Sequence, residues 1–546
     1  MPMAKISSAR KAAFQILMSV ERGQSHSDDL LRAKAVNALS APDRNLATAL
    51  VLGVLRWQIQ LDHQCQALLT RPNAKLDPEI RIALRLGAFQ LLHMDRIPAR
   101  AAIDESVELA QQMGHHFASG MVNAVLHKMV RYKQTLDSLS APAEAFDSMK
   151  GTDINPHAIE SLDPEGGGGF NPRIKPAEKT GASQAAEKLV ELASNGCFVS
   201  GHDFSRAVNA TKSAGALAPE RMRSEESAAD LALAQAHPAW MVERWINFYG
   251  LDAARAICIH GQSQPVLTLR LASPAAEVEL AAAGILFEPG ELLTAARTVV
   301  SGDATATEAF RGGRVRLQDE GSQLVAELAG FFSKSENNPG QKQRKILDCC
   351  AAPGGKTLIL AERNLEAHIV ACESSAARLE QLRKRLAAHE THIECRLADA
   401  SALTEESAFD LALADVPCCG TGTLGRNPEI RHRLRPEDLP RQAERQRAIL
   451  AAALRAVRPG DRVVYSTCSL EPEENEQVVA AVLAANPNAR PVSLEARIGE
   501  MRDNGILTST GAERLCGSLT GEGFLRLLPG TFHTDGFFIC MIERMA

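Results

Sequence analysis

The segment Lys345-Ile-Leu-Asp-Cys-Cys-Ala-Ala-Pro-Gly-Gly-Lys-Thr357 decides the fold that we predict for this chain. It starts as a buried apolar strand, passes through Pro-Gly-Gly, which cannot continue a strand, and runs into helix-forming residues. A glycine turn at the end of a strand lets a ligand approach the backbone, and the next helix offers free N–H groups. In open α/β sheets, ligands bind at this edge. The segment therefore predicts a binding site, although a tight turn without a ligand is an alternative for a Gly-Gly pair taken alone.

Strand-like and helix-like segments alternate from residue 345 onward. The predicted strands occupy 345–351, 368–374, 393–398, 409–416, 461–467 and 536–543, and the clearest helices occupy 375–389 and 440–457. Alternation of this kind is typical of a mostly parallel, doubly wound sheet. The sequence therefore predicts an α/β domain whose strands end at one common edge.

Polar residues stand at the ends of four predicted strands: Glu373, Asp399, Asp415 and Cys468. Glu373 follows the glycine turn by about 20 residues, where dinucleotide folds carry a carboxylate for the ribose hydroxyls. A single strand-end carboxylate is often only a helix cap. Four polar ends on one sheet edge favour a functional site over four independent caps.

Two further loops at this edge carry cysteines, Cys418 and Cys468. A thiol beside a ligand turn can attack an electrophilic carbon once it is deprotonated, whereas a single buried cysteine is more often inert packing. The glycine segment has neither the spacing of a Walker A loop nor a GxGxxG pattern. We therefore expect a nucleoside without a phosphate tail, such as S-adenosylmethionine.

The composition is that of an ordinary globular protein of several domains. The chain has 546 residues, of which 45% are apolar and 23% charged, and its formal net charge is −6. Such a length predicts two to four domains. The 12 cysteines include no CxxC pair, which argues against a zinc ribbon or a disulfide scaffold. No apolar run is long enough to span a membrane, and the first ten residues do not resemble a signal peptide.

The first part of the chain reads as helical and locally basic. Residues 5–135 carry apolar residues at helical spacing, with Asp43 and Asp77 as plausible N-caps. Residues 1–133 hold 17 basic and 11 acidic residues, and residues 426–447 hold seven arginines and four acids. Local basic patches can contact phosphates, although a solvated helix face is an equally good explanation.

The middle of the chain changes character twice. Residues 137–230 are rich in Gly, Ser, Ala and Glu without a period, so we expect a largely disordered linker or insertion. Trp240 and Trp245 then lie on an amphipathic segment and are expected to be core residues. Short β-like runs around a helical stretch in 262–320 predict a small α/β subdomain.

Three motifs together resemble a known family. Cys350-Ala-Ala-Pro-Gly-Gly-Lys356, Asp415-Val-Pro-Cys418 and Ser466-Thr-Cys468 are similar to motifs of the NOL1/NOP2/Sun family of RNA cytosine-5 methyltransferases. Asp43-Arg-Asn-Leu-Ala-Thr48 and Val122-Asn-Ala-Val-Leu126 resemble the NusB-like RNA-binding domain of its bacterial members. The architecture is similar to that of Sun/Fmu-type enzymes, which methylate C5 of cytosine in 16S ribosomal RNA.

The resemblance implies a Rossmann-like class I methyltransferase domain with a mostly parallel seven-stranded sheet. It implies that Cys468 is the nucleophile, that Cys418 helps to release the product, and that Asp415 lies between cofactor and base. The residues it implies for binding S-adenosylmethionine are Cys350, Ala351, Ala352, Pro353, Gly354, Gly355, Lys356, Glu373 (ribose), Asp399 (adenine) and Asp415. No metal is implied.

The sequence departs from the family pattern at three places. Glu373 stands where Asp is more common, Cys419 stands where Ser usually follows the Pro-Cys pair, and His432 replaces a common Trp. The arginines of the 426–435 loop are expected to contact phosphates.

We thus expect four parts: a NusB-like helical RNA-binding domain at 1–136, a low-complexity insertion or linker at 137–235, a small helical and α/β subdomain at 236–335, and the methyltransferase domain at 336–546. The expected protein is a cytoplasmic monomer that binds RNA, with small-subunit ribosomal RNA as the substrate, and needs neither a metal nor a membrane. The alternatives are the same chemistry on transfer RNA or 23S ribosomal RNA, and a non-catalytic RNA-binding or ribosome-assembly factor. The last would need neither Cys418 nor Cys468.

Overall fold

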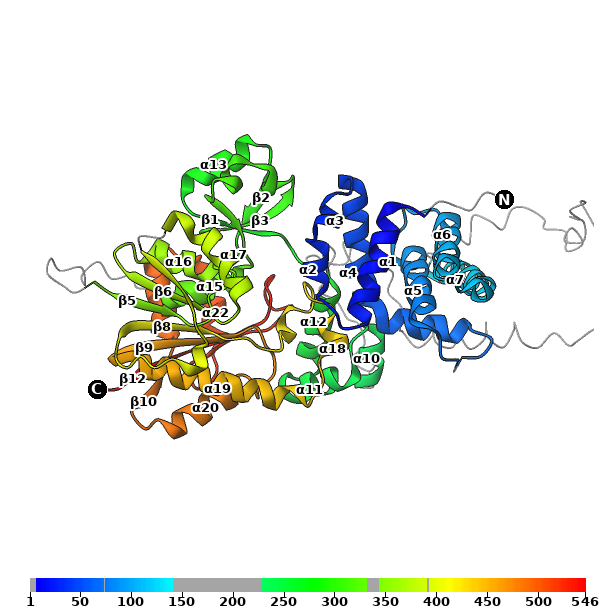
Figure 1. The fold of residues 1–546 in the computed structure, drawn as a ribbon. Helices are drawn as coiled ribbons and strands as arrows, with labels where there is room; N and C mark the ends of the chain where they lie inside the picture. The colour runs from blue at the N-terminus through cyan, green and yellow to red at the C-terminus, as the bar shows by residue number, and fades with distance from the viewer. Residues whose placement is uncertain (1–5, 73, 141–226, 331–342, 390–391) are drawn as a thin grey trace, which may run out of the picture. The chain divides into compact units, whose positions relative to one another are not determined.

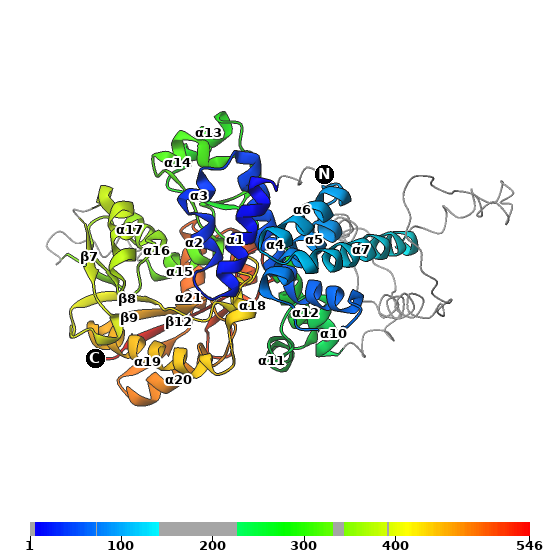
Figure 2. The same ribbon diagram turned by 45° about the vertical axis from the view of Figure 1, so that its right-hand side comes forward.

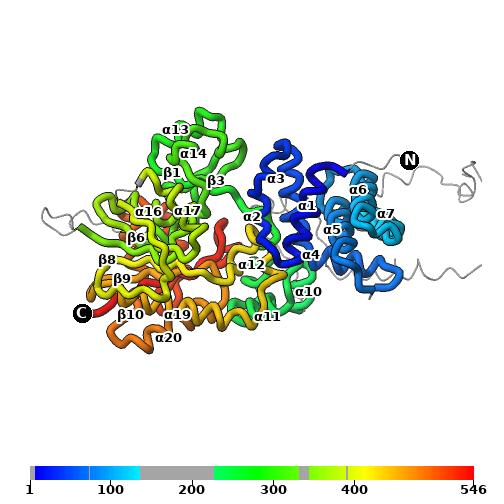
Figure 3. The backbone as a smooth tube through the Cα atoms, in the orientation of Figure 1, coloured from blue at the N-terminus to red at the C-terminus, as the bar shows by residue number. Residues whose placement is uncertain are grey.

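The computed structural model of the protein describes residues 6–72, 74–140, 227–330, 343–389 and 392–546. These residues belong to two compact units, Met1–Ala236 and His237–Ala546. The chain path through each unit can be followed in Figure 3. Among the described helices, none combines the length and the apolar character that a membrane crossing requires.

The first unit is a helical bundle around one apolar core (Figure 1). Its helices are α1 (Ser8–Glu21), α2 (Ser27–Leu31), α3 (Lys34–Asn37), α4 (Ala41–Leu68), α5 (Pro78–His93), α6 (Ala99–Gln112), α7 (Ser119–Ser140) and α10 (Ala228–Ala234). The predicted helical character of residues 5–135 is confirmed for the part of this range that the structure describes. Asp77 occupies the predicted N-cap position of α5, although its side chain makes no capping hydrogen bond, and the prediction for Asp43 is wrong. The cap of α4 is Ser40, whose hydroxyl oxygen accepts the N–H of Asp43 at 3.3 Å.

The predicted insertion falls mostly on residues 141–226, which lie outside the described residues. The two ends of the 137–235 span are helical. Residues 137–140 continue α7, and α10 occupies residues 228–234.

The second unit begins with two helices and a small antiparallel sheet. These elements are α11 (Ala239–Tyr249), α12 (Leu251–Gln262), β1 (Thr268–Leu271), α13 (Pro274–Ala282), β2 (Leu286–Pro289), β3 (Ala296–Ser301), α14 (Glu308–Arg311) and β4 (Val315–Leu317). The strand order is β2-β3-β1-β4. Trp245 is fully buried, as expected of a core residue, whereas Trp240 is half-buried.

A large sheet forms the rest of this unit. Its strands are β5 (Lys345–Asp348), β6 (His368–Glu373), β7 (Ile393–Leu397), β8 (Phe409–Asp415), β9 (Val457–Thr467), β10 (Ala489–Val492), β11 (Leu525–Leu527) and β12 (Phe537–Arg544). The order is β10-β12-β9-β8-β5-β6-β7, and β11 also pairs with β12. The pairs among β5, β6, β7, β8 and β9 are parallel, and those of β12 are antiparallel.

The predicted mostly parallel sheet is confirmed, but among the described residues it has eight strands and not the seven that the family resemblance implies. The additional strand, β11, has only three residues, which is too short to show a period of two. It pairs with the start of β12, next to β10, which pairs with the end of the same strand.

Helices cover both faces of the large sheet (Figures 1 and 2). They are α15 (Glu320–Ala329), α16 (Gly355–Arg363), α17 (Ala376–Leu386), α21 (Glu495–Asp503) and α22 (Ser509–Cys516) on one face, and α19 (Asp438–Ala456) and α20 (Glu476–Ala485) on the other. Neighbouring residues of β5 separate the two cores. Ile346 packs with the first set of helices, and Leu347 packs with α19 and α20.

A buried cluster of ion pairs joins the small sheet to the large one. Glu327 of α15 is fully buried, and its carboxylate contacts Arg270 of β1 at 2.5 Å and Arg363 of α16 at 2.6 Å. Burial alone would raise the pKa of Glu327, but the two arginines outweigh it and hold that pKa below its ordinary value. Glu362 of α16 lies 3.0 Å from the same Arg270, so two carboxylates balance the two arginines of this cluster.

We predict that Glu327→Ala destabilises this unit by about 3–5 kcal/mol, because it leaves the buried Arg270 without its main counter-charge. Urea unfolding followed by circular dichroism measures the change. The control is Glu279→Ala, which breaks the exposed pair with Arg314 in the same subdomain and should leave the unfolding midpoint unchanged. Equal shifts of the unfolding midpoint in the two variants would contradict a stabilising role specific to the buried Glu327.

Candidate active site

The predicted site residues gather at the carboxyl edge of the large sheet. Glu373 is the last residue of β6, Asp415 is the last residue of β8, and Cys468 directly follows β9. Asp399 lies two residues beyond β7. Because these strands run parallel, their ends face one side, where open α/β sheets bind ligands.

The glycine turn between β5 and α16 has no room for side chains. Gly354 has φ +97°, in the region that favours glycine, and its N–H donates to the carbonyl of Ala351 at 2.6 Å. A Cβ on Gly354 would lie 2.9 Å from Leu382, and one on Gly355 would lie 3.2 Å from the amide of Gln318. The first N–H groups of α16 follow at once and have no acceptor within their own helix.

A buried amide oxygen next to this turn needs a partner. Among the described residues, no donor reaches Oε1 of Gln318. The Gln318 Nε2 donates to Ser322 Oγ at 3.4 Å, and Lys356 Nζ donates to the same oxygen at 2.9 Å. Buried polar atoms are normally hydrogen-bonded. The surroundings of Gly355 therefore suit a ligand group that has both donors and acceptors, such as the amino-acid end of a molecule.

Glu373 is connected to the glycine turn, whereas Asp399 is not. The carboxylate of Glu373 is buried and lies 3.5 Å from the guanidinium of Arg378, which also donates to the carbonyl of Ala352 at 3.0 Å. Asp399 is exposed, and its carboxylate accepts the hydroxyl of Ser401 at 2.8 Å and the N–H of Ser401 at 3.0 Å. These bonds hold the pKa of Asp399 below its ordinary value. In this structure Asp399 caps a short 3₁₀ turn.

Asp415 is held by two partners from neighbouring elements. Its Oδ1 accepts the hydroxyl of Ser466 at 2.7 Å, and its Oδ2 lies 2.8 Å from Lys356 Nζ. Burial lowers the pKa of Lys356, but the charge of Asp415 and its hydrogen bond outweigh this, so the pKa lies above its ordinary value. Lys356 thus carries a positive charge between the glycine turn and β8.

The side chains of the two predicted catalytic cysteines are in contact. The Sγ atoms of Cys418 and Cys468 lie 3.3 Å apart, although the residues are 50 positions apart in sequence. The hydrogen bond with Cys468, together with burial, raises the pKa of the Cys418 thiol well above its ordinary value. Cys418 is therefore held as a thiol that can donate to the sulfur of Cys468. The sulfur of the unusual Cys419 points to other partners, Ser469 Oγ at 3.2 Å and Thr421 Oγ1 at 3.5 Å.

The sequence interpretation missed Asp348, the last residue of β5. Its carboxyl group is buried and accepts the hydroxyl of Thr357 at 2.7 Å. Burial, helped by the charge of Asp415, raises the pKa of Asp348 to about 6. The signal was present, because Asp348 is another carboxylate at a strand end directly before the cysteine-glycine segment.

Two arginines of the 426–435 loop bind groups of the same unit in this structure. Arg426 donates to Asp535 at 2.7 Å and to Asp319 at 2.9 Å. Arg431 is buried and donates to the carbonyl of Gly261 at 2.7 Å. The expected phosphate contact is contradicted for the buried Arg431, whereas for Arg426, whose side chain is 31% exposed, it stays a prediction. Arg435 is exposed.

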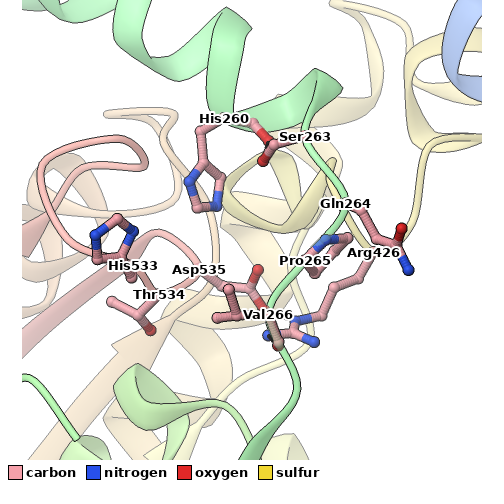
Figure 4. Close-up of a pocket in the computed structure, with 9 residues that line it drawn as sticks. All are labelled: His260, Ser263, Gln264, Pro265, Val266, Arg426, His533, Thr534 and Asp535. Atoms are coloured by element: carbon pink, nitrogen blue, oxygen red, sulfur yellow. Dashed lines mark hydrogen bonds and ion pairs between the residues drawn. The ribbon is translucent and has the colours of Figure 1, made fainter. Parts of the chain in front are cut away.

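A small cavity of about 50 Å³ adjoins the Arg426 ion pairs (Figure 4). It is lined by His260, Ser263, Gln264, Pro265, Val266, Arg426, His533, Thr534 and Asp535. Burial and the charge of Asp319 raise the pKa of Asp535 to about 7. Neither Cys418 nor Cys468 is among the lining residues, so this cavity is separate from the cysteine pair.

Comparison with known proteins agrees with these observations. Residues 337–543 match the family model of the 16S rRNA methyltransferases RsmB/F, and residues 7–131 match that of the NusB family. The predicted family resemblance is thereby confirmed.

Relatives that match nearly the whole chain are named as ribosomal RNA small subunit methyltransferases. The chain is 29% identical to the probable ribosomal RNA small subunit methyltransferase B of Bacillus subtilis, with 99% of each chain covered. It is 26% identical to the ribosomal RNA small subunit methyltransferase B of Pseudomonas putida, with 91% of this chain and 93% of that one covered. The crystal structure of PH0851 shares the fold, with a TM-score of 0.64 and 19% identity over 99% of this chain and 100% of that one.

We predict that Asp348→Asn stabilises the methyltransferase unit above about pH 6. A buried carboxyl group whose pKa rises from 3.8 to about 6 lowers folding stability as pH rises through that window, because only the folded state resists ionisation. The asparagine removes up to about 3 kcal/mol of this penalty and can still accept from Thr357. Urea unfolding at pH 4 and at pH 7.5 measures the difference in the free energy of unfolding between the variant and the wild type. A constant difference between variant and wild type at both pH values would contradict the prediction.

Proposed function

We propose that the protein transfers a methyl group from S-adenosylmethionine to C5 of a cytosine in 16S ribosomal RNA. The observation that carries this proposal is the pair of sulfur atoms 3.3 Å apart, with Asp415 at the end of the adjoining strand β8. Two cysteines allow the attack on the base and the release of the product to be carried out by different groups.

The glycine turn supports a site for S-adenosylmethionine. Cys350 to Lys356 and Gln318 would hold its methionine end, because that end has both donors and acceptors. Glu373 would accept from the ribose hydroxyls, and Asp399 would lie by the adenine. When bound, the cofactor supplies an electrophilic methyl group.

The names of the relatives and the NusB match support RNA as the substrate. We propose that residues 1–136 bind RNA, that residues 236–335 form a small helical and α/β subdomain, and that residues 336–546 carry the chemistry. The relatives are named as small-subunit ribosomal RNA methyltransferases, which favours 16S RNA over transfer RNA or 23S RNA.

In the first step, the thiolate of Cys468 adds to C6 of cytosine. A bond forms between Sγ and C6, the C5=C6 double bond is lost, and N3 takes a proton. The proposed source of that proton is Lys356, whose Nζ lies 2.8 Å from Oδ2 of Asp415 and can pass its proton to N3 through that carboxylate. C5 becomes enamine-like and therefore nucleophilic.

Release reverses the addition once C5 carries the methyl group. The C5 proton leaves to solvent, the C5=C6 double bond re-forms, the C6–Sγ bond breaks, and the N3 proton returns through the Asp415 carboxylate to Lys356. Cys468 departs as a thiolate and needs a hydrogen-bond donor while its charge grows. Cys418, held as a thiol 3.3 Å away, is the proposed donor.

We predict that Cys468→Ala abolishes methylation. Unmethylated ribosomal RNA is incubated with labelled S-adenosylmethionine and either the wild type or the variant. The wild type should label C5 of one cytosine, and the variant should label none while it still binds the cofactor. If only transfer RNA is labelled, the substrate is transfer RNA and not 16S RNA. If no RNA is labelled although the cofactor is bound, a non-catalytic RNA-binding factor is favoured.

We predict the opposite defect for Cys418→Ala, because it retains the nucleophile and loses the donor for release. A covalent enzyme–RNA adduct should accumulate and migrate more slowly than free enzyme on a denaturing gel. The matched control is Cys419→Ser, which keeps a hydroxyl near Ser469 and Thr421 and should release product normally. Absence of the adduct with Cys418→Ala, with RNA bound, would contradict the release role.

A further inference from the structure

Two consecutive residues between β9 and α20 contact both cysteine loops. Glu474 is fully buried and Asn475 is 2% exposed. They lie in the turn that directly precedes α20, and the hydroxyl of Tyr465 in β9 donates to the carbonyl of Glu474 at 2.5 Å. The dipeptide is thus fixed to the strand that leads into Cys468.

Glu474 holds the loop that carries Cys418. Its Oε1 accepts the backbone N–H of Cys419 at 3.0 Å and the side-chain amide of Gln446 at 2.8 Å. The same Gln446 amide donates to the carbonyl of Pro417 at 2.9 Å. The backbone is therefore bound on both sides of Cys418, by two side chains that are each fully buried.

Asn475 holds the loop that carries Cys468 in the same way. Its Oδ1 accepts the hydroxyl of Thr467 at 2.5 Å, and its Nδ2 donates to the carbonyl of Ser469 at 2.9 Å. These are the two sequence neighbours of Cys468. One peptide unit thus separates the side chain that fixes one cysteine from the side chain that fixes the other.

We propose that Glu474 and Asn475 are positioning residues that set the separation between the sulfurs of Cys418 and Cys468. Neither side chain needs to touch the base or the cofactor. The role rests on the proposed cysteine chemistry and extends it to residues outside the three family motifs. Buried polar residues can also serve the fold alone, but here the bonded groups belong to the immediate neighbours of the two cysteines.

Because Glu474 and Asn475 bind different cysteine loops, the loss of each side chain should impair a different step of the reaction. Loss of the Glu474 side chain frees the Cys418 loop and leaves Cys468 in place, so addition proceeds and release fails. Loss of the Asn475 side chain frees the Cys468 loop, so addition itself fails. A displacement of about 1 Å at a reacting group can cost about 100-fold in rate. A contribution to folding alone would impair both steps in both variants.

The test compares Glu474→Ala, Glu474→Gln and Asn475→Ala with Cys418→Ala, using ribosomal RNA and S-adenosylmethionine. Turnover is measured as methylated RNA, and the adduct is measured on a denaturing gel. We expect Glu474→Ala to lose about 100-fold in turnover and to accumulate the adduct as Cys418→Ala does. Glu474→Gln keeps an acceptor for Cys419 and Gln446 and should restore release. Asn475→Ala should give neither product nor adduct.

Glu471→Ala is the matched control. Glu471 is a fully buried carboxylate of the same turn, but it accepts from Arg244 at 2.8 Å and from Trp245 at 3.2 Å, not from the cysteine loops. It should not accumulate the adduct. If Glu474→Ala does not fold, Gln446→Leu removes the bond to Pro417 from α19 and should accumulate the adduct in its place.

The outcomes separate this inference from the proposed function. If Cys418→Ala accumulates the adduct but folded Glu474→Ala and Gln446→Leu do not, the positioning role is wrong and the cysteine chemistry stands. If Cys418→Ala itself forms no adduct, the proposed release step fails. Wild-type turnover in Glu474→Ala, or an adduct in Asn475→Ala, would also overturn the positioning role.

Discussion

The parallel pairing of β8 with β9 is the constraint on which the rest of the site depends. In this pair Asp415 lies opposite Ser466, so both strands end at nearly the same height. The loops that follow can bring two sulfur atoms to 3.3 Å because their starting points are already aligned. A shift of the register by one residue would turn each side chain to the other face of the sheet.

The charges at this edge are arranged around one ammonium group. Lys356 reaches from the first turn of α16 to Asp415, and its raised pKa keeps the positive charge in the interior. Asp348 lies deeper in the same region, where burial and the charge of Asp415 raise its pKa to about 6. The edge therefore holds one charged carboxylate–ammonium pair and a further carboxyl group that resists ionisation.

Local patterns made much of this fold predictable. The strand-glycine-helix pattern at residues 345–357 and the alternation that follows it are properties of short segments, so the parallel sheet and its polar edge could be predicted. Contacts between distant segments could not. The charge of Arg426 is visible in the sequence, but its partners Asp319 and Asp535 come from elements more than 100 positions away.

Local sequence patterns also identify the two cysteines, but they do not identify the residues that hold the cysteine loops. Cys418 and Cys468 could be chosen from their motifs, because a cysteine after a strand has a recognisable chemistry. Glu474 and Gln446 lie in helical or turn segments with many similar acids and amides, and nothing local distinguishes them. Their importance comes from a bond between residues 28 positions apart that only the folded chain forms.

The last strand of the chain also closes the cysteine loop. The N–H of Gly422 donates to the carbonyl of Cys468 at 2.9 Å, and the N–H of Gly536 donates to the carbonyl of Gly422 at 2.8 Å. A Cβ on Gly422 would lie 2.5 Å from the Gly536 oxygen, so three backbones meet here without a side chain between them. Contacts of such large sequence separation form late in folding. The backbone that carries Cys468 is therefore completed by a segment 114 positions after Gly422, so the geometry of the cysteine loop depends on a part of the chain that holds none of the proposed catalytic residues.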